Sequence, residues 1–160
     1  MLPFNGYREA RRLRKSSNMN DLPQCGQRFV WPVRVYYEDT DSAGVVYYAN
    51  YLRYFERART EWLRALGFEQ TDLAERHNVV FVVRSINVEY LQPARFNDEL
   101  RVTVEPAVPG ASQIMLEQRI VRGPDRITDA KVRIACVNQH AMKPVSIPGP
   151  LLEKIGIKTT

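Results

Sequence analysis

The sequence predicts one α+β domain in which a single long helix packs against an antiparallel sheet. Only residues 48–66 have apolar side chains at the spacing of a long amphipathic helix. Five other stretches are rich in β-branched and aromatic residues, and short turns separate the last three of them. One helix beside closely spaced consecutive strands favours a two-layer α+β fold.

The first strand and the long helix come early in the chain. We expect the strand over residues 28–37, where Pro32 predicts an edge position or a bulge, since proline cannot donate a ladder hydrogen bond. Residues 42–44 supply a turn, and Gly67 marks the end of the helix. The apolar stripe of this helix, which we expect to form core, consists of Tyr51, Phe55, Ala58, Trp62 and Leu66.

The rest of the chain is mainly strand. A short helix over residues 72–77 is predicted, with Thr71 as its cap, and another over residues 150–155. Four more strands are expected over residues 79–91, 99–108, 113–121 and 127–138. Because short turns join the last three of them, we expect these three to form an antiparallel meander.

Length and charge predict one domain, over residues 28–160, behind a basic tail. The chain has 160 residues and a net charge of +5. Residues 1–27 hold five Lys and Arg against two Asp and Glu, so this tail, which we expect to be disordered, carries +3 of the total. Met19 is an alternative start. The domain itself gives little reason to expect nucleic acid as a partner.

Composition also bounds the compartment and the site chemistry. No apolar run approaches the roughly 20 residues of a membrane span, so we expect a soluble protein. The two cysteines, Cys25 and Cys136, form no paired motif, which predicts neither a disulfide framework nor a metal site. A reducing, cytoplasmic location fits best.

The segment DTDSAG contains the candidate site, with Asp39 and Asp41 two residues apart. Composition leaves two interpretations open: turn and capping residues, or a functional carboxylate. If the chain stays extended, both side chains share one side. A calcium loop is excluded because its fifth and twelfth positions would be Ala43 and Asn50. The hydrolase motifs GxSxG and HExxH are absent.

A carboxylate before a helix start suggests acyl transfer. Free N–H groups at the start of a helix favour negative charge on a carbonyl oxygen, and an aspartate can attack that carbonyl or activate water. A thioester suits such a site, since its thiolate leaves without an obvious general acid. No cofactor is expected.

Three stretches of the chain, the first of which contains DTDSAG, resemble a known family. The run RVYYEDTDSAGVVYYANYLRYFERARTEWLRALGF, then FVVRSINVEYLQPARFNDEL and HAMKPVSIP, is similar to the 4-hydroxybenzoyl-CoA thioesterase family of hotdog-fold acyl-CoA thioesterases. Within it, the chain most resembles the bacterial branch associated with the Tol-Pal system. The resemblance implies a long helix wrapped by a curved antiparallel sheet of about five strands. It also implies a homo-oligomer, often a dimer of dimers, with its active site at the subunit interface.

The resemblance also assigns roles to residues. It implies acyl-CoA as substrate, Asp41 as the catalytic acid, acting as nucleophile or general base, and the backbone N–H of Tyr48 as oxyanion donor. The loop residues that shape this site would be Gly44, Val45, Val46 and Tyr47. Some relatives carry histidine where this chain has Tyr48, so imidazole chemistry at that position is excluded here.

Weaker expectations concern phosphate binding and rival functions. Arg84 and Arg95 flank the second strand and are candidates to bind phosphates of coenzyme A, although solvated arginines at a strand edge are the plainer interpretation. The alternative function is a non-catalytic module that binds acyl-CoA or acyl carrier protein. Nucleic-acid binding depends on the tail alone.

Overall fold

The computed structural model describes residues 28–156, which form one five-stranded sheet, three α-helices and one 3-10 helix. The predicted tail and Cys25 lie outside the described residues. The elements are β1 (Phe29–Arg34), η1 (Tyr37–Asp39), α2 (Asn50–Ala65), α3 (Gln70–His77), β2 (Val79–Tyr90), β3 (Glu99–Pro109), β4 (Gln113–Arg122), β5 (Asp125–Asn138) and α4 (Gly149–Ile155).

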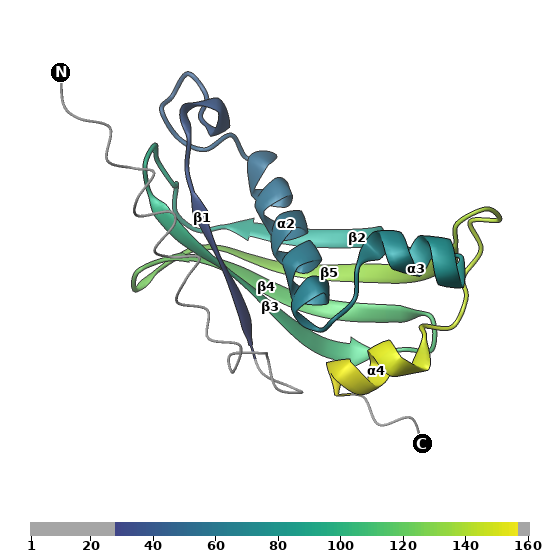
Figure 1. Cartoon of the computed structure of the whole chain (residues 1–160). Coiled ribbons are helices and arrows are strands. Elements are labelled where there is room, and N and C mark those ends of the chain that lie inside the picture. The colour runs from purple at the N-terminus through teal and green to yellow at the C-terminus, as the bar shows by residue number, and fades with distance from the viewer. Residues whose placement is uncertain (1–27, 157–160) are drawn as a thin grey trace, which may run out of the picture.

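The strands lie in the order β1-β3-β4-β5-β2, and all neighbours are antiparallel. The predicted meander is confirmed as β3, β4 and β5. In Figure 1, α2 crosses one face of this curved sheet. Register shifts in the β2–β5, β3–β4 and β4–β5 pairs add local bends. A long helix on a curved five-stranded antiparallel sheet is the expected hotdog architecture.

The first strand is an edge strand, as Pro32 predicts. Pro32 lies opposite Arg101 of β3, and the β1–β3 register has no shift, so the edge explains the proline. The strand ends at Arg34, before the predicted end at residue 37. The chain turns into η1 there because the Asp39 carboxylate accepts a hydrogen bond from the Tyr36 N–H, at 2.8 Å.

The long helix is confirmed, but its start is not residue 48. The Asn50 N–H donates to the Tyr47 carbonyl at 2.8 Å, so residues 47–50 form a turn and α2 begins at Asn50. Gly67, with φ of +91°, follows the helix as predicted. The predicted core stripe is buried: Tyr51, Phe55, Ala58, Trp62 and Leu66 are each at most 8% exposed.

The cap predicted for the second helix is wrong. Helix α3 begins at Gln70, its N-cap is Glu69, and no side chain caps it, so Thr71 lies inside the helix. The helix ends at His77, and its C-cap, Asn78, adopts the left-handed conformation with φ of 54°.

A buried amide connects α2 to the sheet. The Gln118 side chain on β4 is fully buried, accepts from Arg59 at 2.9 Å and donates to the Phe55 carbonyl at 3.2 Å. Because a buried amide without partners is costly, these bonds favour one seating of α2 on the sheet. Over residues 28–156, no helix is both long enough and apolar enough to cross a membrane.

Candidate active site

The two neighbouring aspartates lie in different environments. The chain does not stay extended between them, since Asp39 ends η1 and Asp41 follows in a tight turn. Asp39 is 7% exposed, and its backbone carbonyl accepts from the Tyr47 N–H at 2.9 Å and from the Asn50 side chain at 2.8 Å. Asp39 has the capping role that composition left open, because its carboxylate accepts from the N–H of Tyr36, the N-cap of η1, whereas Asp41 is exposed.

Asp41 begins a small hairpin. Its N–H donates to the Val45 carbonyl at 2.9 Å, and the Gly44 N–H donates to its carbonyl at 3.0 Å. Gly44 has φ of +77°, which favours glycine. One carboxylate oxygen accepts from the Ala43 N–H at 2.8 Å. This Asx turn orients the carboxylate while leaving it open to solvent.

The hairpin is fixed to the chain that follows β2. The Val46 N–H donates to the Ala94 carbonyl at 2.8 Å, and Val45 pairs with Arg95 in an isolated bridge. The Ala94 N–H donates to the Tyr51 hydroxyl on α2 at 3.0 Å. Helix, hairpin and this segment therefore hold one another.

Tyr48 precedes α2 by two residues, which corrects the expectation that the helix starts there. Its amide has no hydrogen-bond partner among residues 28–156, and neither does the amide of Ala49, the N-cap. No side chain caps the helix. Because the Asn50 side chain donates to the Asp39 carbonyl at 2.8 Å, one closed loop from Asp39 to Asn50 contains both the Asp41 turn and these two free amides.

A groove of about 280 Å³ opens beside these amides. Val46, Tyr48 and Tyr51 line it from the loop and α2, and Tyr90 lines it from the end of β2. Leu91, Gln92 and Pro93 complete the wall. Of the four loop residues predicted to shape the site, Val46 lines this groove, and the ring of Tyr47 packs edge-on against Tyr48.

The two predicted arginines are not brought together. Arg95 is exposed beside the hairpin, bridged to Val45, and its N–H donates to Asp98 at 2.9 Å. Arg84 is exposed at the register shift of β2, six residues before Tyr90. At about 3.3 Å per residue, Arg84 lies roughly 20 Å along the strand from the groove in the same chain.

Tyr90 also belongs to this site, although the sequence did not predict it. Its hydroxyl donates to the Tyr48 carbonyl at 3.0 Å, and its ring packs against the rings of Tyr48 and Tyr51. Burial raises the pKa of Tyr90, so the hydroxyl stays protonated at neutral pH. No local pattern signals this contact, because 42 residues separate the partners.

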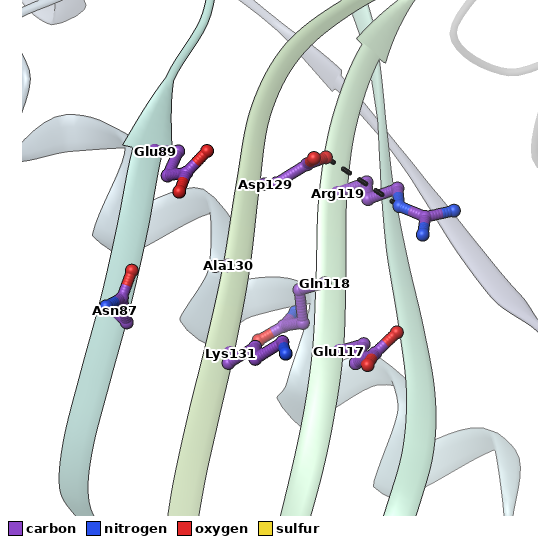
Figure 2. A pocket seen from close by; sticks show the side chains of 8 residues that line it. All are labelled: Asn87, Glu89, Glu117, Gln118, Arg119, Asp129, Ala130 and Lys131. Atoms are coloured by element: carbon purple, nitrogen blue, oxygen red, sulfur yellow. Dashed lines mark ion pairs between the residues drawn. The ribbon is translucent and has the colours of Figure 1, made fainter.

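Another hollow, of about 260 Å³, lies on the face of the sheet turned away from α2 (Figure 2). Charged side chains of β2, β4 and β5 line it, and Arg119 and Asp129 form an ion pair at 3.7 Å. It shares no residue with the groove beside Tyr48, so we do not assign it to the candidate site. In residues 28–156, no group of three or more His, Cys, Asp or Glu side chains could hold a metal.

Comparison with known proteins identifies the family. Residues 35–155 match the model of the thioesterase-like superfamily. The chain belongs to the thioesterase-like superfamily. This membership accounts for the hotdog architecture.

Three relatives in the thioesterase-like superfamily are close in sequence or structure. Acyl-CoA thioesterase YbgC of Haemophilus influenzae is 47% identical over 120 residues, which cover 75% of this chain and 88% of that protein. Acyl-CoA thioester hydrolase YbgC of Escherichia coli is 48% identical over 122 residues, covering 75% and 90%. A probable thioesterase from Bartonella henselae, 36% identical, has a TM-score of 0.74 and covers 76% of this chain and 100% of its own.

Proposed function

We propose that this protein hydrolyses acyl-CoA thioesters to a free carboxylic acid and coenzyme A. The observation that carries the proposal is one closed loop with an exposed, oriented Asp41 carboxylate and the unpartnered Tyr48 amide. Relatives that are 47% and 48% identical over three quarters of this chain are named acyl-CoA thioesterase and acyl-CoA thioester hydrolase.

The chemistry divides between Asp41 and the start of α2. Asp41 acts as nucleophile, giving an acyl anhydride, or as general base that takes a proton from water. As the tetrahedral oxyanion forms, the Tyr48 N–H and the dipole of α2 stabilise its charge. The C–S bond then breaks, and the thiolate leaves without needing a proton from the enzyme. In the nucleophilic route, water then hydrolyses the anhydride, which releases the carboxylic acid and regenerates the Asp41 carboxylate.

The acyl group and the nucleotide need separate surfaces. An apolar cavity of about 130 Å³ between α2 and the sheet, lined in part by Trp62, Phe81 and Val83, would receive the acyl group of a substrate bound at the groove of a neighbouring subunit, since Phe81 and Val83 lie even farther along β2 from the groove of their own chain than Arg84 does. Arg95, exposed beside the Asp41 hairpin, would bind a phosphate of coenzyme A. Arg84 would do so from a neighbouring subunit, since it lies far along β2 from the groove of its own chain.

Assembly is expected through β2, an edge strand of 12 residues. An edge strand offers unpaired N–H and C=O groups to a second copy, and the side chain of Val83 is 48% exposed there. Two copies would form one continuous sheet, and two such dimers a homotetramer. The cavity of Phe81 and Val83 would then border the partner.

The family resemblance extends the proposal to cellular context. The motifs resemble the Tol-Pal-associated branch, so we place the enzyme with that system, with acyl carrier protein as a further candidate partner. We also place it in the cytoplasm, a reducing compartment in which the buried thiol of Cys136 would stay reduced.

Thiol release from short, long and aromatic acyl-CoA esters tests the proposal. We expect the full chain to hydrolyse at least one ester, and Asp41→Asn to lose at least about 100-fold in kcat, the size expected for a positioned base. Asp72→Asn, which changes an exposed carboxylate in the first turn of α3, is the matched control and should keep full activity. Equal inactivity of wild type and Asp41→Asn with retained acyl-CoA binding would replace the enzyme by a binding module.

A further inference from the structure

Three hydrogen bonds fix the turn that leads into α2. The Tyr47 N–H donates to the Asp39 carbonyl at 2.9 Å, and the Asn50 N–H donates to the Tyr47 carbonyl at 2.8 Å. The Tyr90 hydroxyl donates to the Tyr48 carbonyl at 3.0 Å. The first two bonds are within the loop, whereas the third comes from the sheet.

Each of these carbonyl bonds fixes the direction of an N–H group. A trans peptide unit is planar, and its C=O and N–H point in opposite directions. The bond to the Tyr47 carbonyl therefore orients the Tyr48 N–H away from the helix. In the same way, the Tyr90 hydroxyl orients the Ala49 N–H by holding the Tyr48 carbonyl. Both of these N–H groups are unpartnered among the described residues.

We propose that Tyr90 is a positioning residue, whose hydroxyl aligns the Tyr48–Ala49 peptide so that two consecutive amides converge on the thioester carbonyl oxygen. The inference rests on the proposed thioesterase function and adds to it a second donor and the group that holds it. Consecutive N–H groups at the start of a helix form a concave anion site, and they stabilise an oxyanion only while their direction is fixed.

Tyr90 is suited to this role because its own position is fixed. It is the last residue of β2 and pairs with Thr128 of β5. Its ring lies 5.6 Å from the ring of Tyr51, a buried residue of α2. No side chain caps α2 at its N-cap, Ala49. Within the described residues, the Tyr90 hydroxyl is therefore the only hydrogen-bond donor to the Tyr48 carbonyl.

The Tyr90→Phe variant tests the inference, because phenylalanine keeps the ring and removes only the hydroxyl. We expect kcat to fall about 5- to 10-fold, a fraction of the 10²–10³-fold cost of deleting an oxyanion donor. KM, the affinity for coenzyme A and the melting temperature should stay unchanged. Tyr37→Phe is the matched control: Tyr37 is 75% exposed, stacks on Phe96 and should keep wild-type kcat.

A second measurement reports the amides without turnover. The infrared carbonyl stretch of a bound acyl-CoA analogue, in which a methylene group replaces the thioester sulfur, should lie at lower frequency in wild type than in Tyr90→Phe. An active wild type with unchanged kcat and carbonyl frequency in Tyr90→Phe would overturn the inference and leave the thioesterase proposal standing. A raised KM at constant kcat would also overturn it. An inert wild type would remove both proposals.

Discussion

Replacing Asp39 with alanine should cost stability, although it lies two residues from the proposed catalytic acid. The Asp39 carboxylate is 7% exposed and accepts from the Tyr36 N–H at 2.8 Å. The Asp39 carboxylate also lies close to the buried hydroxyl of Tyr54. Burial and this carboxylate raise the pKa of Tyr54, so the tyrosine stays neutral beside the charge.

The magnitude follows from what alanine leaves behind. A hydrogen bond to a charged group contributes about 1.5–3 kcal/mol. The Tyr36 N–H is on an exposed residue and can regain water after the substitution, so the loss should lie in the lower half of this range. We therefore expect Asp39→Ala to lower the free energy of unfolding by about 2 kcal/mol. At about 4 °C per kcal/mol for a domain of this size, the melting temperature should fall by about 8 °C.

Urea unfolding, followed by circular dichroism at pH 7 and fixed protein concentration, measures this loss. Asp39→Asn is the matched control, since its amide oxygen still accepts from the Tyr36 N–H, and it should cost less than about 1 kcal/mol. Asp41→Asn should cost less than about 0.5 kcal/mol, because its exposed side chain keeps the bond from Ala43. Equal stability losses for Asp39→Ala and Asp41→Asn would refute the division of roles.

Two more predictions concern the loop after β2 and the sheet edge. Burial opposes ionisation of Asp98, but hydrogen bonds from the Arg95 amide and Arg122 hold its pKa below the usual value. The Arg122–Asp98 pair at 2.8 Å should therefore contribute about 1 kcal/mol at pH 7, lost as the pH falls below about 4. In urea unfolding, the difference between Arg122→Ala and wild type should shrink at low pH, and a constant difference from pH 7 to pH 3 would contradict this. Sedimentation of the full chain should give a dimer or tetramer, and a monomer at micromolar concentration would contradict assembly through β2.

The regular elements could be predicted because their signals are local. The apolar stripe from Tyr51 to Leu66 has a helical period that side-chain burial enforces, and Gly67 can adopt the positive φ at the helix end. Pro32 could be assigned to an edge strand because it lacks an N–H for the ladder.

The details of the candidate site depend on contacts between distant segments. The difference between Asp39 and Asp41 arises from packing of Asp39 beneath α2, and two acids in one short motif look alike in sequence. Helix α2 starts at Asn50 because Tyr47 accepts its N–H, a turn that helical periodicity does not report. The catalytic assignment of Asp41 came from family resemblance and stays a prediction.

A backbone oxyanion donor separates chemistry from specificity at position 48. Any residue except proline supplies the same N–H there, so the tyrosine found where some relatives carry histidine leaves the proposed chemistry intact. The side chain of residue 48, in contrast, shapes the groove: the Tyr48 side chain is 61% exposed, lines the groove and packs edge-on against Tyr90. A residue at this position can therefore reshape the groove without altering the donor. The bonds that orient the two proposed donors do not involve this side chain, because the Asn50 N–H binds the Tyr47 carbonyl and the Tyr90 hydroxyl binds the Tyr48 carbonyl.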